Sequence, residues 1–244
     1  MLPKITSLTK NVHLPIADVN AKVSAFKIAE EKILILHNNS TEDEIEHIIF
    51  ELIKNKTTGV DVESLTMPDL IILLINIIDI SRGMKRNFTY KCTKENEEGT
   101  LCGTLIEMEV NALDYKLSNE VQRNKLIKVD DNITCELDYP TYKMIKEISK
   151  YSENDGEFLL RFYSQLIKAV YFKDEVYTNY TDDEIYEWTL ELPHRVLKEF
   201  ETFVNGIPEV IVEYDVVCPK CGTSEHYVAS NLLDFFIFDT QARI

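Results

Sequence analysis

The stretch VVCPKCGTSEHY, residues 216–227, carries two cysteines, Cys218 and Cys221, that are separated by two residues. This spacing lets two thiolates bind one tetrahedral metal ion. Pro219 and Gly222 suit the tight turn that such a pair needs, in which backbone N–H groups point at sulfur. The stretch therefore predicts half of a metal site, and the rest of the chain has to supply the other half.

A second pair of cysteines lies at the two ends of a polar turn in YKCTKENEEGTLCG, residues 90–103. Apolar and polar residues alternate on both sides of this turn, which predicts a β-hairpin with one cysteine on each strand. Zinc binds four thiolates in closed structural sites. We therefore predict a structural zinc ion, with the ligands Cys92, Cys102, Cys218 and Cys221.

Two alternatives remain for these cysteines. The four can be reduced thiols that pack as small apolar groups without a metal. His226, five residues after Cys221, can replace Cys92 or Cys102 as a ligand, although a histidine there is more often an ordinary strand residue. The fifth cysteine, Cys135, is expected to pack. Because four thiolates leave no open position for water, zinc here would be structural and not catalytic.

The remaining patterns predict an α+β protein. Apolar residues recur at helical spacing in residues 38–56, 65–83, 141–151, 155–172 and 181–206. Period-two alternation predicts the first hairpin from residue 87, a second hairpin in 125–140 and C-terminal strands in 209–218 and 226–238. Helices followed by hairpins, instead of alternating strand–helix–strand units, indicate the α+β class, with the hairpins joined in a zinc-ribbon-like module.

We expect four successive regions that together form one compact domain. They are an N-terminal helical region (1–86), a β-hairpin region with the first cysteine pair (87–139), a second helical region (140–206) and C-terminal strands with the CPKCG turn (207–244).

Several helix ends have clear signals. Thr41 with Glu44, and Thr181 with Glu184, fit the capping box at a helix start. The most apolar helix is expected to begin at Pro68, to end at Gly83 and to be buried, because it is apolar almost all round.

Charge and composition exclude several classes of protein. The 244 residues include 26 Lys and Arg against 42 Asp and Glu, a net charge of −16 that opposes broad binding to nucleic acid. No signal peptide opens the chain and the cysteines follow no disulfide-rich spacing, so we expect a reducing cytoplasm. The longest apolar run, residues 70–80, is too short for a membrane span of about 20 residues.

Motifs for catalysis are also missing from the sequence. It contains no phosphate-binding glycine loop, no HExxH and no GxSxG pattern, and the five histidines are scattered. The acidic runs TEDEIE and TDDEIYE fall in the first turns of predicted helices, where negative charge stabilises the helix dipole. We therefore expect that the protein is not an enzyme.

With these landmarks placed, the chain resembles the baseplate hub assembly proteins of T-even-type contractile-tailed bacteriophages. The segments that carry the resemblance are LPKI (2–5), FKIAEEKILIL (26–36), DVESLTMPDLIILLINIIDISRG (61–83), the hairpin cysteines with CPKCG (218–222), and DFF (234–236). The family pattern has basic residues just before its serine–glycine turn. This chain has Ile78, Asp79 and Ile80 there, with Arg82 inside the turn.

The resemblance implies a non-enzymatic protein that helps to build the hub of the tail baseplate, as a chaperone, a scaffold or a minor hub component. Its partners would be other phage baseplate hub or tail proteins, without nucleic acid or membrane, and its oligomeric state is left open. It would act in the host cytoplasm during virion assembly, and in the virion baseplate if it stays there.

The alternative is a zinc-ribbon adaptor that binds polymerase or nucleic acid in phage transcription. Such a ribbon should carry basic residues around its cysteine turns, but Glu95, Glu97 and Glu98 outnumber Lys94 in the hairpin turn. The C-terminal apolar residues either pack in the core or contact a partner. They are Leu232, Leu233, Phe235, Phe236, Ile237 and Phe238.

Overall fold

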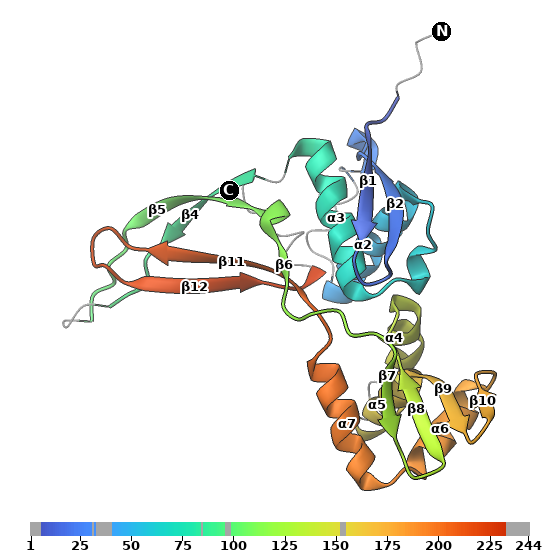
Figure 1. Cartoon of the computed structure of the whole chain (residues 1–244). Helices are drawn as coiled ribbons and strands as arrows, with labels where there is room; N and C mark the ends of the chain where they lie inside the picture. Colours follow the sequence, from blue (N-terminus) through green and yellow to red (C-terminus); the bar gives the residue numbers. More distant parts are fainter. Residues whose placement is uncertain are drawn as a thin grey trace. The chain divides into compact units, whose positions relative to one another are not determined.

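A computed structural model of the chain describes residues 6–30, 32, 41–83, 85–95, 99–151 and 155–232. The chain divides into two compact units, each built from segments that are distant in sequence. Unit 1 comprises residues 1–62, 68–118 and 209–244, and unit 2 comprises residues 63–67 and 119–208. Both units contain helices and antiparallel strands (Figure 1), which confirms the α+β class.

Unit 1 has three small antiparallel sheets among its described residues, in the orders β1-β2-β3, β4-β5 and β12-β11-β6. The strands are β1 (Thr9–Leu14), β2 (Val19–Ser24), β3 (Thr57–Thr58), β4 (Lys85–Lys91), β5 (Leu105–Asn111), β6 (Lys116–Leu117), β11 (Val210–Val217) and β12 (Ser224–Ala229). The helices are α2 (Glu42–Lys56) and α3 (Met67–Arg82), and η2 (Ala112–Asp114) is a short 3-10 turn. A second 3-10 turn, η1 (Val62–Ser64), spans the boundary in sequence between the two units.

Helix α3 forms the core of unit 1. Every residue from 68 to 78 is buried, which confirms the prediction of a buried helix. The fully buried carboxylate of Asp69 accepts hydrogen bonds from the backbone N–H groups of Ile16 (3.2 Å) and Ala17 (2.9 Å), and so fastens the β1–β2 turn to the start of the helix. At the other end Gly83 adopts a φ of +80°, and its N–H donates to the carbonyl of Asp79 at 2.7 Å.

Unit 2 has one antiparallel sheet among its described residues, in the order β10-β9-β8-β7. The strands are β7 (Lys125–Lys128), β8 (Ile133–Leu137), β9 (Ile167–Phe172) and β10 (Glu175–Tyr177), and η3 (Ser149–Tyr151) is a 3-10 turn. The helices are α4 (Tyr142–Ile148), α5 (Asp155–Gln165), α6 (Asp182–Leu190) and α7 (His194–Asn205). Leu137 and Phe200 are among its most buried apolar side chains.

Most predicted elements are confirmed. Both capping boxes form, at Thr41 for α2 and at Thr181 for α6. The two predicted hairpins are the pairs β4–β5 and β7–β8, and the strand predicted over 209–218 is β11. The strand predicted over 226–238 is confirmed only as far as Ala229, where β12 ends, and residues 233–238 lie outside the described residues. The aromatic residues Phe235, Phe236 and Phe238 lie outside the described residues.

Three predicted stretches need correction. The helix expected over 155–172 ends at Gln165, and residues 167–172 form strand β9, because they pair with both β8 and β10. The helical stretch 181–206 is two helices, α6 and α7, since Pro193 cannot continue the first one. The region 1–86, expected to be helical, also contains β1, β2 and β3, whose alternating residues bury one face.

The described part of the chain contains no helix with the length and apolar character that a membrane span requires.

Candidate metal centre

The first cysteine pair sits where the β4–β5 hairpin opens into its turn. Cys92 follows the last residue of β4, and its N–H donates to the carbonyl of Thr104 at 2.9 Å. Gly103 returns a hydrogen bond of 3.0 Å to the carbonyl of Cys92, with a φ of +63° that favours glycine. The N–H of Cys102 donates to the carbonyl of Lys94 at 2.7 Å. These three hydrogen bonds place the two thiols opposite each other.

The second pair sits in the turn between β11 and β12. The N–H of Cys218 donates to the carbonyl of Thr223 at 2.8 Å, and the N–H of Gly222 donates back to the carbonyl of Cys218 at 2.9 Å. Gly222 has a φ of +72°, which a side chain would strain. The CPKCG stretch therefore closes into the tight turn that its sequence predicts, with Cys221 at its tip.

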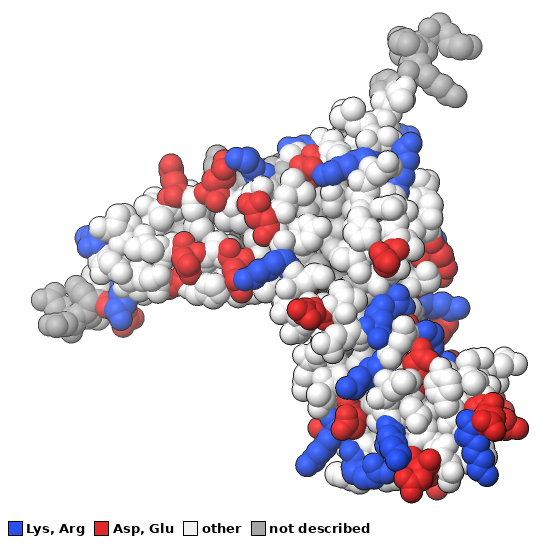
Figure 2. All heavy atoms as spheres, viewed as in Figure 1, with Lys and Arg blue, Asp and Glu red and all other residues white. Residues whose placement is uncertain are grey.

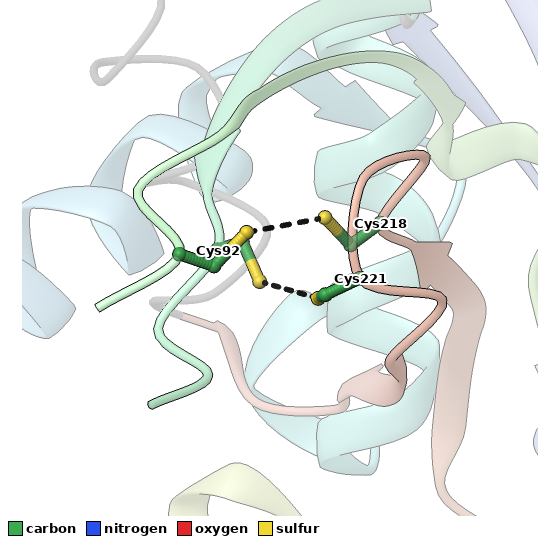
Figure 3. Close-up of side chains that lie close together, drawn as sticks. Cys92, Cys218 and Cys221 are labelled. Atoms are coloured by element: carbon green, nitrogen blue, oxygen red, sulfur yellow. Dashed lines mark hydrogen bonds between the residues drawn. The ribbon is translucent and has the colours of Figure 1, made fainter. Parts of the chain in front are cut away.

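The two pairs meet although they are more than a hundred residues apart in sequence. The sulfur of Cys92 lies 3.6 Å from that of Cys221 (Figure 3). The sulfur of Cys102 lies 3.8 Å from that of Cys218. All four sulfur atoms lie within 4.8 Å of one another. The distances are far too long for disulfides, and all four cysteines are free thiols.

This donor set fits zinc. Four sulfurs at about 2.3 Å from a tetrahedral ion stand about 3.8 Å apart, close to the two distances found here. Zinc at this position would be held by Cys92, Cys102, Cys218 and Cys221, and it would cross-link the two hairpins. Cys92 and Cys218 are buried, with 1% and 2% of their surfaces exposed, so two of the ligands would be shielded from solvent.

The surroundings of the thiols differ in their effect on ionisation. Hydrogen bonds with the side chain and backbone of Thr223 lower the pKa of the Cys221 thiol to about 6. The side chain and backbone of Thr104 lower the pKa of Cys102 in the same way. At Cys92 a backbone hydrogen bond from Lys94 acts downward, but burial and the neighbouring thiols outweigh it and raise the pKa to about 12. Two of the four positions therefore favour the thiolate form that metals bind.

A hydrogen-bonded clamp beside the cysteines is the feature that the sequence interpretation missed. The hydroxyls of Tyr90 and Tyr227 both donate to Oε2 of Glu225, each at 2.6 Å, and thereby connect β4 with β12. The ring of Tyr227 also stacks on Tyr214, with centroids 5.5 Å apart. The only signal in the sequence is that Tyr90 lies two residues before Cys92, on the same side of the strand.

The remaining candidates are accounted for elsewhere. His226 does not join the cysteine cluster, and its Nδ1 lies 2.8 Å from Oδ1 of Asp215, the residue opposite on β11. Cys135 packs in the core of unit 2 with no exposed surface, and burial raises its pKa to about 12. The alternative ligand set with His226 is therefore not supported by this geometry.

Comparison with known proteins adds one finding. The model of the family described as T4 bacteriophage base plate protein matches residues 6–237, which is nearly the whole chain. No curated protein and no solved structure gives a significant match.

Proposed function

This chain belongs to the T4 bacteriophage base plate protein family, and we propose that it helps to assemble the baseplate hub by binding other baseplate or tail proteins. In this proposal it acts as a chaperone, a scaffold or a minor hub component, in the host cytoplasm during virion assembly. The observation that carries the proposal is the family match over residues 6–237, because it covers both units and not one small module.

A structural zinc ion at Cys92, Cys102, Cys218 and Cys221 is part of the same proposal. The ion would join β4–β5 to β11–β12 as two turns of a zinc-ribbon-like module, and the clamp at Glu225 supports the same arrangement. A zinc ion bound by four thiolates cross-links the chain, and its full coordination sphere leaves no position for a substrate. The function we propose is therefore binding without catalysis.

The charges around this module favour a protein partner. Figure 2 shows acidic side chains along the part of the surface formed by the hairpins. Glu107 and Glu109 on β5, and Glu213 and Asp215 on β11, occupy outward positions that alternate with more buried residues. Glu109 and Glu213 form ion pairs with Lys85 and Lys116, but the chain as a whole carries a net charge of −16, which would repel the phosphates of nucleic acid and would attract basic proteins.

The test is co-expression of the full chain with the hub and spike subunits from the same phage genome, followed by affinity capture. We expect at least one baseplate subunit to be captured, and we expect complex formation to slow as salt rises from low to physiological levels. Capture of DNA or RNA polymerase in place of any tail protein would support the transcription adaptor and refute the proposal.

Deletion of residues 233–244 tests whether the C-terminal aromatic segment contributes to binding. If that segment is a binding site, the shortened chain stays folded and loads zinc but captures less of the partner. Unfolding of the shortened chain would instead assign the segment to the core.

A further inference from the structure

Unit 2 contains a groove to which neither the cysteine cluster nor the family match assigns a role. It has a volume of about 410 Å³, within the range of roughly 300–1,000 Å³ that is typical of ligand sites. Its walls come from three strands, from the loop after β10 and from α6. The lining residues are Ile133, Val170, Phe172, Tyr177, Asn179, Tyr180, Glu184, Ile185 and Trp188.

The strand register explains why the groove is apolar. Phe172 pairs with Ile133 on β8, and Val170 pairs with Tyr177 on β10. These four side chains therefore share one face of the sheet, and α6 lines the same groove through Ile185 and Trp188. Phe172 stays 37% exposed and Tyr177 49% exposed. The sheet thus presents aromatic surface to solvent beside the helix.

Two polar groups in the groove have no hydrogen-bond partner in the part of the chain that the structure describes. They are the side-chain amide of Asn179 and the indole N–H of Trp188. An amide and an indole N–H among aromatic walls suit a peptide backbone, whose carbonyl and N–H groups need partners when apolar surface is buried. A purely aliphatic ligand would leave both groups unsatisfied.

The rim of the groove is acidic. Glu184 lines it, Asp174 lies in the turn between β9 and β10, and Glu175 begins β10 opposite Phe172. Lys173, in the same turn, lies over the ring of Phe172 at 5.0 Å. The acidic charge of the rim favours a ligand with basic residues. The chain's own C-terminal apolar stretch contains Asp234 and is followed by Asp239, so the acidic rim would repel it.

We propose that this groove binds an extended segment of a partner protein that inserts one large apolar side chain and carries Lys or Arg beside it. The aromatic walls take the apolar anchor, Asn179 and Trp188 bind the segment's backbone, and the carboxylates of Glu175 and Glu184 pair with the basic residues. The proposal rests on the proposed function, because it defines the chemistry of one partner that a protein-binding baseplate component would recognise.

Trp188 makes the groove directly measurable, because it is the only tryptophan in the chain. The probes are nine-residue peptides in a Gly-Ser background, with a central Phe flanked by Lys on both sides. Matched peptides carry Ala in place of Phe, or Glu in place of Lys. We expect a saturable change in Trp188 fluorescence with the Phe-Lys peptide, and affinity lower by about tenfold or more for each matched peptide.

Variants of the full chain locate the binding. Asn179→Trp places a bulky side chain at the exposed mouth of the groove, so its binding of a fluorescein-labelled Phe-Lys peptide should be lost, as measured by anisotropy. Glu175→Lys should weaken binding by about tenfold, whereas Glu187→Lys, the same charge change at an exposed residue of α6 outside the lining, should leave it nearly unchanged. Equal binding of the Lys and Glu peptides, or no binding of the Phe-Lys peptide, would overturn the proposal.

The other occupants give distinct results. A tenfold gain in peptide affinity on deletion of residues 233–244 would identify the chain's own C-terminal segment as the occupant and overturn the proposal. A dimer in sedimentation that Asn179→Trp dissociates would identify a second copy and also overturn it.

If the wild-type chain captures a baseplate subunit and Asn179→Trp captures it equally well, the proposed function stands and the groove is not the binding site. If the groove binds the peptide but no baseplate subunit is captured, the proposed function fails.

Discussion

At the scale of single residues, the cysteine cluster depends on sulfur atoms that backbone hydrogen bonds hold in place. Gly103 and Gly222 allow the two turns to close. The Cys221 thiol donates a hydrogen bond to the hydroxyl of Thr223 at 3.4 Å, and the Cys102 thiol shares one of 3.2 Å with the hydroxyl of Thr104. Either pair of cysteines without the other would bind zinc weakly, because a closed tetrahedral zinc site needs all four thiolates.

Replacing one ligand should therefore cost as much as replacing two. Cys218→Ser and Cys92→Ser should each abolish stoichiometric zinc and lower thermal stability by a similar amount, since structural zinc can supply on the order of 10 kcal/mol to the fold it closes. The double variant should add little to either loss. Metal analysis and thermal unfolding measure both effects.

Cys135→Ala is the control for this series, because Cys135 lies in the core of unit 2, whereas the clustered cysteines belong to unit 1. It should keep one zinc per chain. Independent, additive losses for the two ligand variants would mean that the pairs do not share an ion.

A second prediction at this scale concerns Glu136 on β8. Its carboxylate accepts hydrogen bonds from the hydroxyl of Tyr171 and, at 3.0 Å, from Nζ of Lys168, and these partners hold its pKa below the usual value. A lowered folded-state pKa stabilises the protein above the unfolded-state pKa of about 4.3, and this contribution is lost as pH falls through the folded-state value.

Glu136→Gln should accordingly lower the free energy of unfolding by about 1.5 kcal/mol at pH 7 and by progressively less below about pH 4.5. Urea unfolding at a series of pH values measures the difference from wild type. The exposed Glu199→Gln on α7 serves as the control and should change the free energy of unfolding little. A difference that stays constant down to pH 3 would refute this linkage.

At the scale of elements, short-range signals determine where helices begin. The hydroxyl of Thr181 accepts a hydrogen bond from the N–H of Glu184 at 3.2 Å, and the N–H of Thr181 donates one of 2.7 Å to Oε2 of the Glu184 side chain. The box starts α6, the helix that carries Trp188 into the groove of unit 2. A substitution that removes this cap should therefore affect both the stability of unit 2 and the position of Trp188 in the groove.

Thr181→Ala should lower the free energy of unfolding of unit 2 by about 1 kcal/mol, because the first turn of α6 loses its cap. Urea unfolding followed by Trp188 fluorescence reports on this helix directly. Thr178→Ala, in the exposed segment before the cap, is the matched control and should change the midpoint little. Equal effects of the two substitutions would show that the capping box contributes nothing measurable.

At the scale of the whole molecule, the chain builds two compact units with separate cores. The four clustered cysteines all lie in unit 1, and the single tryptophan lies in unit 2. Units with their own cores can unfold as separate cooperative transitions. Metal removal and tryptophan fluorescence therefore report on different parts of the protein.

We expect a chelator to lower the unfolding temperature of unit 1 and to leave that of unit 2 nearly unchanged. Circular dichroism should show an earlier transition after the chelator is added, while the midpoint followed by Trp188 fluorescence should stay in place. Addition of zinc should restore the first transition. An equal shift of both midpoints would mean that the units unfold as one.

The sequence alone determined the features that depend on neighbours within a few residues. Caps at Thr41 and Thr181, the stop at Gly83 and the CPKCG turn each follow from local hydrogen bonding and backbone conformation. The α+β class and the two hairpins followed from periodicity, since a buried face repeats every two residues in a strand and every 3.6 in a helix.

Tertiary structure decided what distant residues do together. Residues 167–172 fit a helical pattern, but pairing with β8 and β10 makes them a strand, because hydrogen bonds to two neighbours outweigh a weak local preference. The clamp at Glu225 and the groove around Trp188 join segments whose sequences carry no mark of one another. The cysteine cluster combines both origins: local spacing predicted each pair, but only the packing of β4–β5 against β11–β12 brings sulfurs 116 and 129 residues apart within 4 Å.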